Sequence, residues 1–248
     1  MDAIVDRLRA AGCVFAEHEA RLLIAEARTV AERERLVDRR VAGEPLEYVL
    51  GWAEFAGLRI ALEPGVFVPR RRTEFLVAQA AKATKPHAVV VDLCCGSGAL
   101  GAALAAAQPG IELHAADLDP VAVRCARRNI AGAVYEGDLF DALPQALKGH
   151  VDVLLANAPY VPTDAVALMP PEAREHEARA ALDGGRDGLD VLRRVIADTP
   201  HWLAGNGTMF VESSDEQAPP LAAAMHGVGL TPQIVQDGHG ATVVRGQN

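Results

Sequence analysis

Aromatic side chains and long apolar runs are both scarce in this chain. Only 4% of its 248 residues are Phe, Trp or Tyr, while half are hydrophobic, so Ala, Val and Leu must build the core. No apolar stretch approaches the roughly 20 residues that span a membrane. Residues 1–4 also lack the basic-then-apolar pattern of a secretion signal. We therefore expect a cytoplasmic protein without membrane contact, with one large α/β domain and a small appendage.

Positive charge and cysteine are also limited. The chain has 24 Lys and Arg against 33 Asp and Glu, a formal net charge of −9. Binding to a phosphate backbone needs clustered Lys and Arg, so we do not expect direct nucleic-acid binding. The spacing of Cys13, Cys94, Cys95 and Cys125 fits neither a zinc site nor a disulfide framework. We expect reduced structural thiols and no metal site.

The order of apolar patterns predicts the fold. Residues 1–42 form a short helical region, in which residues 17–41 are charged on one side and apolar on the other. Residues 43–72 form a β-hairpin linker, with two short strands around a turn at 54–60. From residue 73 to 248 strands and helices alternate, and Thr73 is placed to cap the first helix. This order predicts a parallel, doubly wound sheet with a modified end. The expected strands are 89–93, 111–116, 133–136, 151–156, 208–211, 233–235 and 242–245, and the expected helices are 73–83, 99–107, 120–130 and 189–203.

A glycine loop follows the first strand of this domain. Gly96 and Gly98 allow a backbone to approach a ligand closely, and with Gly101 they match a dinucleotide-binding pattern. A dinucleotide site, however, places its first glycine almost directly after the strand, whereas Asp92 and two cysteines intervene here. An acid at the strand end suits a ligand with a cationic centre and an amino group, as in S-adenosylmethionine. Asp92 could also simply cap the loop.

Acids at the ends of the next two strands extend this prediction. Asp117 is placed to accept hydrogen bonds from both ribose hydroxyls. Asp138 is placed to accept one from the adenine amine, with Leu139 or Phe140 near the ring, although a turn Asp beside a core Phe would look the same. The expected cofactor contacts are Asp92, Cys94, Gly96, Gly98, Asp117, Leu118, Asp138, Leu139 and Asn157.

The most informative segment is the quartet Asn157, Ala158, Pro159 and Tyr160, which follows a buried strand at 151–156. An Asn at a strand end, fixed by Pro and followed by an aromatic residue, can hold a planar nitrogen such as an amide or a base amine. These four residues are the predicted catalytic residues. Tyr160 is expected either over the acceptor or in the core.

The segment 161–187 is a long connection directly after the quartet, so we assign it to substrate binding. Met169, Pro170 and Pro171 are candidate contacts there. Arg70, Arg71 and Arg72 form a basic cluster that is either a solvated face or a contact for an acidic partner or RNA.

These motifs, in this order, resemble the HemK-type protein-(glutamine-N5) methyltransferases over nearly the whole chain. The resemblance implies a seven-stranded, Rossmann-like class I sheet, S-adenosylmethionine as cofactor and the side-chain amide of a protein glutamine as acceptor. It implies that Asp117 holds the ribose and Asn157 the acceptor amide. The segments that carry it are 43–51, 67–70, 73–74, 92–98, 157–160, 169–172, 181–185 and 187–189.

The chain departs from that family pattern in three ways. Ala158 stands where Pro is usual, Arg71 and Arg72 stand where Pro and an acid are usual, and the N-terminal helical part is shorter. A residue at position 158 would act through its carbonyl, which Ala retains. The loss of proline's fixed φ costs on the order of 1 kcal/mol, so we expect activity to survive.

The leading hypothesis is therefore methylation of a glutamine amide in a translation-related protein, with a release factor and a ribosomal protein both as candidates. The alternatives are an adenine-N6 methyltransferase acting on DNA or RNA, an enzyme for small-molecule amides or amines, and a non-catalytic protein that binds S-adenosylmethionine. The net charge of −9 counts against the nucleic-acid alternative. We expect a monomer or a weak dimer.

Overall fold

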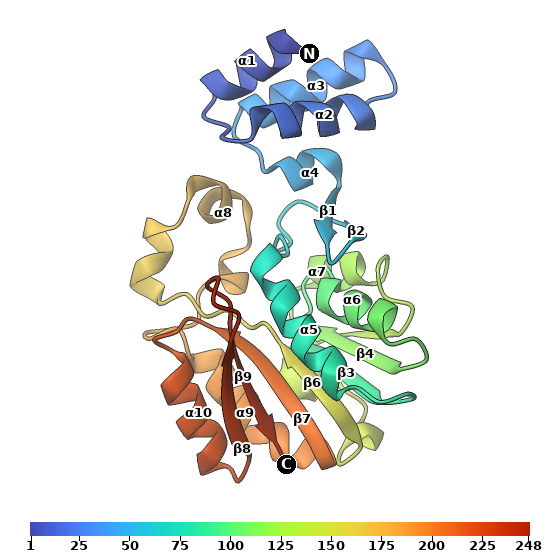
Figure 1. Ribbon diagram of the computed structural model, residues 1–248, viewed down its shortest axis with the longest axis vertical. Coiled ribbons are helices and arrows are strands. Elements are labelled where there is room, and N and C mark those ends of the chain that lie inside the picture. Colours follow the sequence, from blue (N-terminus) through green and yellow to red (C-terminus); the bar gives the residue numbers. More distant parts are fainter.

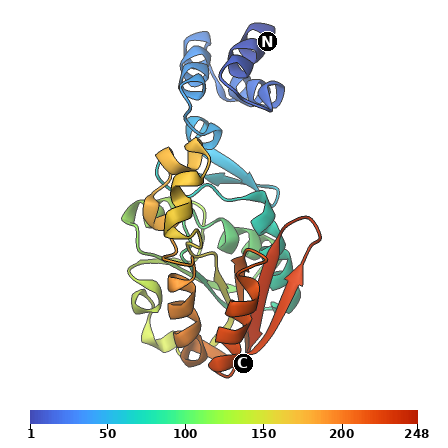
Figure 2. The same cartoon turned by 90° about the vertical axis from the view of Figure 1, so that its left-hand side faces the viewer.

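Three short helices at the N-terminus stand apart from the rest of the chain in the computed structural model, which describes residues 1–248 (Figures 1 and 2). They are α1 (Asp2–Ala10), α2 (Ala16–Glu26) and α3 (Val30–Val41), and ten buried residues form their common core with the start of the following segment. The amphipathic run at 17–41 is split in two. Thr29 accepts a hydrogen bond of 3.1 Å from the Glu32 N–H and so caps α3.

The connecting segment contains a helix as well as the predicted hairpin. Its elements are α4 (Leu46–Leu50), β1 (Trp52–Phe55), β2 (Leu58–Ala61) and the single 3-10 turn η1 (Arg71–Thr73). The two strands pair antiparallel with Glu54 opposite Arg59, so the hairpin at 54–60 is confirmed. The cap assigned to Thr73 is wrong. Its hydroxyl makes no cap bond to α5 (Glu74–Ala83) and is buried without a partner.

Seven strands form the main sheet in the order β5-β4-β3-β6-β7-β9-β8. The strands β3 to β7 run parallel, and β9 pairs antiparallel with both β7 and β8. The predicted doubly wound sheet with a modified end is therefore confirmed. The strands are β3 (Val89–Leu93), β4 (Glu112–Asp117), β5 (Ala133–Glu136), β6 (Val151–Ala156), β7 (Leu203–Ser213), β8 (Thr231–Gln236) and β9 (Thr242–Gln247).

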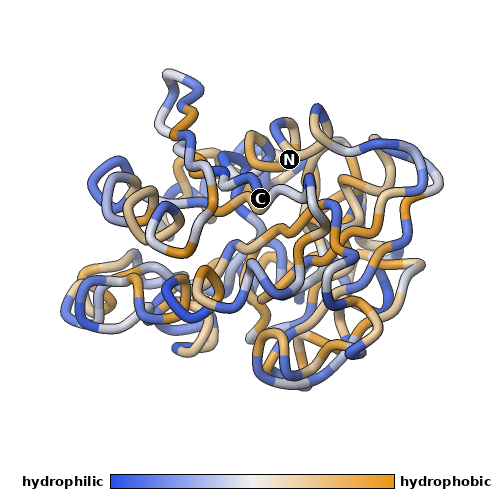
Figure 3. The backbone as a smooth tube through the Cα atoms, turned by 90° about the horizontal axis from the view of Figure 1, so that it is seen from below, coloured by the Kyte–Doolittle hydropathy of each residue, from blue (hydrophilic) through white to orange (hydrophobic).

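Helices cover both faces of this sheet (Figure 1). Successive residues of a strand point to opposite faces, so Val90 packs in the core under α5, α6 (Ala99–Ala107) and α7 (Pro120–Ala126). Val91 packs instead under α9 (Asp190–Trp202) and α10 (Ala218–Gly227). Both cores are mainly aliphatic, as the composition requires. Figure 3 shows apolar segments in the interior of the main domain and hydrophilic segments around its outside. No helix is long and apolar enough to cross a membrane.

The strand order reverses at β3, which pairs with β4 on one side and β6 on the other. Leu93 lies opposite both Ala116 and Ala156, so the carboxyl ends of these three strands meet at one edge of the sheet. In open α/β sheets, ligands bind outside the carboxyl ends of the strands at such a switch point. The predicted glycine loop, Asp117 and the quartet all follow these strands.

Candidate active site

A cavity of about 480 Å³ opens at this edge of the sheet. We divide its lining into two sides. The glycine-loop side is formed by residues that follow β3, β4 and β5 and by α9. The quartet side is formed by residues before and within η1, after β6 and near α8 (Pro171–His176). The glycine-loop side is lined by residues 94–97, 99–100, 117–120, 122, 138, 191 and 194, and the quartet side by 65–67, 69–70, 72, 157–161, 169, 178 and 180–182.

Asp117 lies between the glycine loop and the start of α7. Its Oδ2 accepts a hydrogen bond of 2.8 Å from the Gly96 N–H, and its Oδ1 accepts one of 2.9 Å from the Asp119 N–H. Burial raises the pKa of this carboxyl although the two N–H groups oppose the shift. Gly96 has a φ of +55°, a left-handed conformation that glycine adopts without strain. The loop thus holds the carboxylate in a fixed place on the cavity wall.

Three other predicted cofactor contacts also line the glycine-loop side. Cys94 leaves β3 in a left-handed conformation with a φ of +55°, and burial raises the pKa of its thiol. Leu118 is 64% exposed and lines the cavity, where it offers an apolar surface. The Asp138 carboxylate forms a 2.6 Å ion pair with Arg194 of α9, so its oxygens are partly committed within the chain.

Asp92, Gly98 and Leu139 do not line the cavity. The Asp92 carboxyl is 1% exposed and accepts a hydrogen bond of 2.9 Å from the Gly101 N–H in α6, as the capping alternative required, while its Oδ1 has no partner. A Cβ on Gly98 would come within 2.7 Å of Ile130, so this glycine permits close packing of α6. Leu139 packs against the core beneath α9. Their direct contact with a cofactor stays a prediction.

The quartet lies on the other side of the cavity, and all four residues line it. Ala158 is 1% exposed, and neither its N–H nor its carbonyl takes part in a hydrogen bond within the chain. Tyr160 is held by its hydroxyl and by its carbonyl. The Asn157 side chain, in contrast, is half-buried and hydrogen-bonded to no group of the protein. An Asn carboxamide and a carbonyl are therefore free at neighbouring positions.

Residues outside the predicted site pack against the backbone of the quartet and fix it. A Cβ on Gly184 would lie 2.6 Å from the Pro159 carbonyl oxygen, and one on Gly188 would lie 2.2 Å from that of Tyr160. Gln217 Nε2 donates to the Tyr160 carbonyl at 2.8 Å and to the Asp187 carbonyl at 3.1 Å. The glycine spacing at 184–188 was visible in the sequence, whereas nothing there marked Gln217.

The connection at 161–187 reaches the cavity and is structured, and its assignment to substrate binding stays a prediction. It holds α8 and the 3-10 turns η4 (Thr163–Leu168) and η5 (Arg179–Ala181). Met169 lines the cavity, whereas Pro170 and Pro171 do not. His176, the last residue of α8, is half-buried.

Two motifs before η1 anchor this connection. The Arg70 guanidinium donates to both oxygens of the buried Glu177 carboxylate at 2.6 and 2.7 Å. The Tyr48 hydroxyl, which donates to the Val66 carbonyl at 2.6 Å, also lies 3.5 Å from the His176 carbonyl at the end of α8. Of the predicted basic cluster, Arg72 forms an ion pair with one oxygen of Glu212 at 3.0 Å, and Arg71 is exposed without an ion-pair partner. Two of the three charges are thus neutralised within the chain and are not a free patch.

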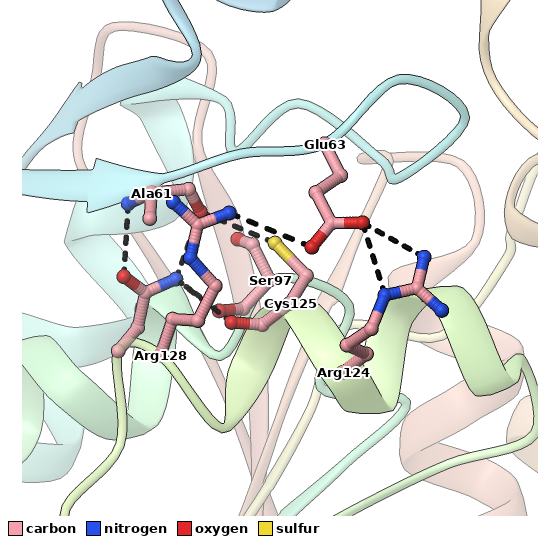
Figure 4. Close-up of polar contacts among 7 residues, drawn as sticks. Ala61, Glu63, Ser97, Arg124, Cys125 and Arg128 are labelled. Carbon is pink, nitrogen blue, oxygen red and sulfur yellow. Dashed lines mark hydrogen bonds and ion pairs between the residues drawn. The ribbon is translucent and has the colours of Figure 1, made fainter.

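The helical region and the connecting segment are also fixed to the domain. Arg40 of α3, 8% exposed, pairs with Glu19 of α2 and reaches Glu172 of α8, each at 2.6 Å. Figure 4 shows Glu63, which follows β2, between Arg124 and Arg128 next to α7. The Glu63 contacts hold the start of the segment whose residues 65–67, 69 and 70 line the cavity.

The arrangement is shared with known proteins. A family model described as "Methyltransferase small domain" matches residues 57–186. The release factor glutamine methyltransferase of Geobacter sulfurreducens is 39% identical over 188 residues, which cover 74% of this chain and 65% of that protein. The namesake from Bifidobacterium longum is 32% identical over 263 residues, covering 90% of this chain and 89% of that protein.

A solved structure shows the same fold. The T. thermophilus 16S rRNA N2 G1207 methyltransferase, determined in complex with AdoMet and guanosine, superimposes with a TM-score of 0.58 at 18% identity. The superposition covers 79% of this chain and 49% of that one. The chain spans just under two thirds of the Geobacter relative and most of the Bifidobacterium relative. This protein belongs to the release factor glutamine methyltransferase family.

Proposed function

We propose that this protein transfers a methyl group from S-adenosylmethionine to the side-chain amide nitrogen of a glutamine in a release factor. The observation that carries the proposal is the Asn157 carboxamide, which lies in the cavity without a partner beside the free Ala158 carbonyl. The proposed partner is the class of protein that the names of the relatives give.

The glycine-loop side suits S-adenosylmethionine in its chemistry. The cofactor supplies an electrophilic methyl group on a sulfonium. The Asp117 carboxylate would accept hydrogen bonds from the ribose hydroxyls, because its oxygens remain at the cavity wall while two N–H groups fix them. The exposed Leu118 side chain and Cys94 would cover the adenine, with Asp138 near its amine.

The quartet side would bind the acceptor amide. An amide nitrogen is a weak nucleophile because its lone pair is delocalised into the carbonyl. The Asn157 side-chain oxygen and the Ala158 carbonyl would each accept one N–H of the glutamine amide and so fix the direction of its nitrogen. As the bond from the nitrogen to the methyl carbon formed and the sulfonium–methyl bond broke, with S-adenosylhomocysteine as the neutral leaving group, the nitrogen would become positive and both acceptors would bind it more strongly. The surplus proton leaves to water after the transfer.

The parts of the chain have different proposed roles. We assign residues 73–248 to the methyltransferase domain, residues 43–72 to a linker that also covers the cavity, and residues 1–42 to recognition of the protein substrate. The Arg40–Glu172 ion pair supports the recognition role of residues 1–42, because it joins this helical region to the segment that lines the quartet side.

The test uses the purified chain, a release factor and S-adenosylmethionine with a deuterated methyl group. We expect one deuterated methyl on a glutamine of the release factor, located by tandem mass spectrometry of its peptides. A release factor whose candidate glutamines are replaced by glutamate serves as the control. Label on ribosomal protein, on nucleic acid or on a small molecule, with the release factor unlabelled, would overturn the proposal.

A further inference from the structure

Arg72, Tyr160 and Glu212 form a polar cluster on the quartet side of the cavity. The Arg72 Nε donates to Glu212 Oε1 at 3.0 Å, and its Nη2 donates to the Tyr160 hydroxyl. The Tyr160 hydroxyl donates in turn to the same Glu212 oxygen at 3.0 Å. The three side chains come from η1, the quartet and β7, which are far apart in the sequence.

The Glu212 carboxylate needs Arg72. Its side chain is only 4% exposed, its second oxygen has no hydrogen-bond partner, and Arg72 is its sole ion-pair partner. A buried carboxylate without a paired cation is strongly unfavourable. The Arg72 side chain is 53% exposed and Arg72 lines the cavity, so this residue pairs with Glu212 and also borders the quartet side.

Tyr160 is consequently fixed at both ends. Its carbonyl is held by Gln217, and its hydroxyl is held between Arg72 and Glu212. The ring lines the cavity three residues after Asn157. A side chain fixed in this way is a rigid wall and adjusts little when an acceptor binds.

We propose that Arg72 is a positioning residue for methyl transfer, which acts by holding the Tyr160 ring against the acceptor amide through Glu212 and the Tyr160 hydroxyl. The proposal rests on the proposed function, because it assigns the acceptor to the quartet side. Arg72 forms an ion pair with Glu212 and lines the cavity, whereas its neighbour Arg71 is exposed and does not line the cavity.

The test compares kcat, KM for the release factor and Kd for S-adenosylmethionine in four variants. We expect Arg72→Ala to lower kcat about 10-fold with the cofactor Kd unchanged, since small misplacements near the reacting atoms are costly. Arg72→Lys restores part of the loss because it keeps a cation beside Glu212. Tyr160→Phe, which removes only the hydroxyl oxygen, lowers kcat by a similar factor. Arg71→Ala is the matched control and is expected to behave as the wild type.

A double variant separates positioning from general stabilisation. If Arg72 acts through the Tyr160 hydroxyl, Arg72→Ala costs much less in the Tyr160→Phe background than in the wild type. Equal losses in both backgrounds, or full activity of Tyr160→Phe, would overturn the proposal even where Arg72→Ala folds poorly. The same assay measures methyl transfer by the wild type and by Arg71→Ala. If neither protein transfers a methyl group to the release factor, the proposed function fails, and not only the role of Arg72.

Discussion

The backbone N–H of Gly96 donates a 2.8 Å hydrogen bond to the Asp117 carboxylate and so ties the loop after β3 to the end of β4. The second oxygen of Asp117 accepts from the Asp119 N–H at the start of α7. One acid therefore sets the geometry of both loops on the glycine-loop side of the cavity. Its position there is the structural basis for the ribose role that we propose.

Replacement of Asp117 by Ala should weaken binding of S-adenosylmethionine about 10- to 100-fold, because hydrogen bonds to a charged group contribute roughly 1.5–3 kcal/mol. Isothermal titration calorimetry measures this affinity directly. Asp141→Ala, which removes an exposed acid outside the cavity, is the control and should bind normally. Unchanged affinity in Asp117→Ala would refute the ribose role.

The glycines behind the quartet should not tolerate a side chain. Ala at position 184 or 188 would press a Cβ against the carbonyl of Pro159 or Tyr160, at 2.6 or 2.2 Å. Both changes should lower the melting temperature and the transfer rate together, because the quartet must shift. Gly205→Ala is the matched control, since its Cβ would meet nothing within 4 Å. Wild-type rates in Gly184→Ala would show that this contact does not position the quartet.

Proline at position 158 should be tolerated. The Ala158 N–H donates no hydrogen bond, so a proline would remove none, and its carbonyl would remain available. We expect Ala158→Pro to retain transfer within about threefold and to change the free energy of unfolding by no more than about 1 kcal/mol. Chemical denaturation and steady-state kinetics check both values. A large loss of transfer would mean that the site depends on alanine at this position.

Burial of Asp92 should make stability depend on pH. Its desolvation raises the pKa to about 7, above the value of about 3.9 expected in the unfolded chain. The folded state therefore binds this proton more tightly, so the contribution is present at low pH and is lost as pH rises from about 4 to about 7. Its upper bound is on the order of 4 kcal/mol.

Urea denaturation at pH 5 and pH 8 tests this contribution in the wild type and in Asp92→Asn. The Asn variant has no titrating group at this position. The free energy of unfolding of the wild type should therefore fall more between the two pH values than that of the variant. Equal changes in the two proteins would show that Asp92 does not titrate in this range.

The sheet could be predicted from the sequence because each central strand is a short, mostly apolar run bounded at both ends by turn-forming or polar residues. The predicted strands at 89–93, 133–136 and 151–156 have the observed bounds. The helical run at 17–41 was harder, because the break before Thr29 has no glycine or proline. Only the Thr29 and Glu32 spacing marked the new helix start.

The candidate site was predictable where a residue follows a strand, because strand order alone brings such residues to one edge. Asp117 and Asn157 are of this kind. Side chains that meet through tertiary packing were not predictable from local pattern. Arg72 with Glu212 and Gln217 with Tyr160 join segments more than 50 residues apart. Asp92 also ends a strand at this edge, but its carboxylate accepts from the Gly101 N–H of α6 and does not line the cavity, which strand order alone does not reveal.

The central claim is that Asn157 binds the acceptor amide, and the most direct test is Asn157→Ala assayed for both methyl transfer and cofactor binding. The substitution removes a hydrogen-bond acceptor whose bond to the amide nitrogen strengthens in the transition state, so kcat should fall by about 100-fold or more. Binding of S-adenosylmethionine, measured by calorimetry on the same preparation, should be retained. Loss of cofactor binding together with transfer would make Asn157 a cofactor contact or a structural residue, and full transfer would remove it from the chemistry; either result would contradict this account.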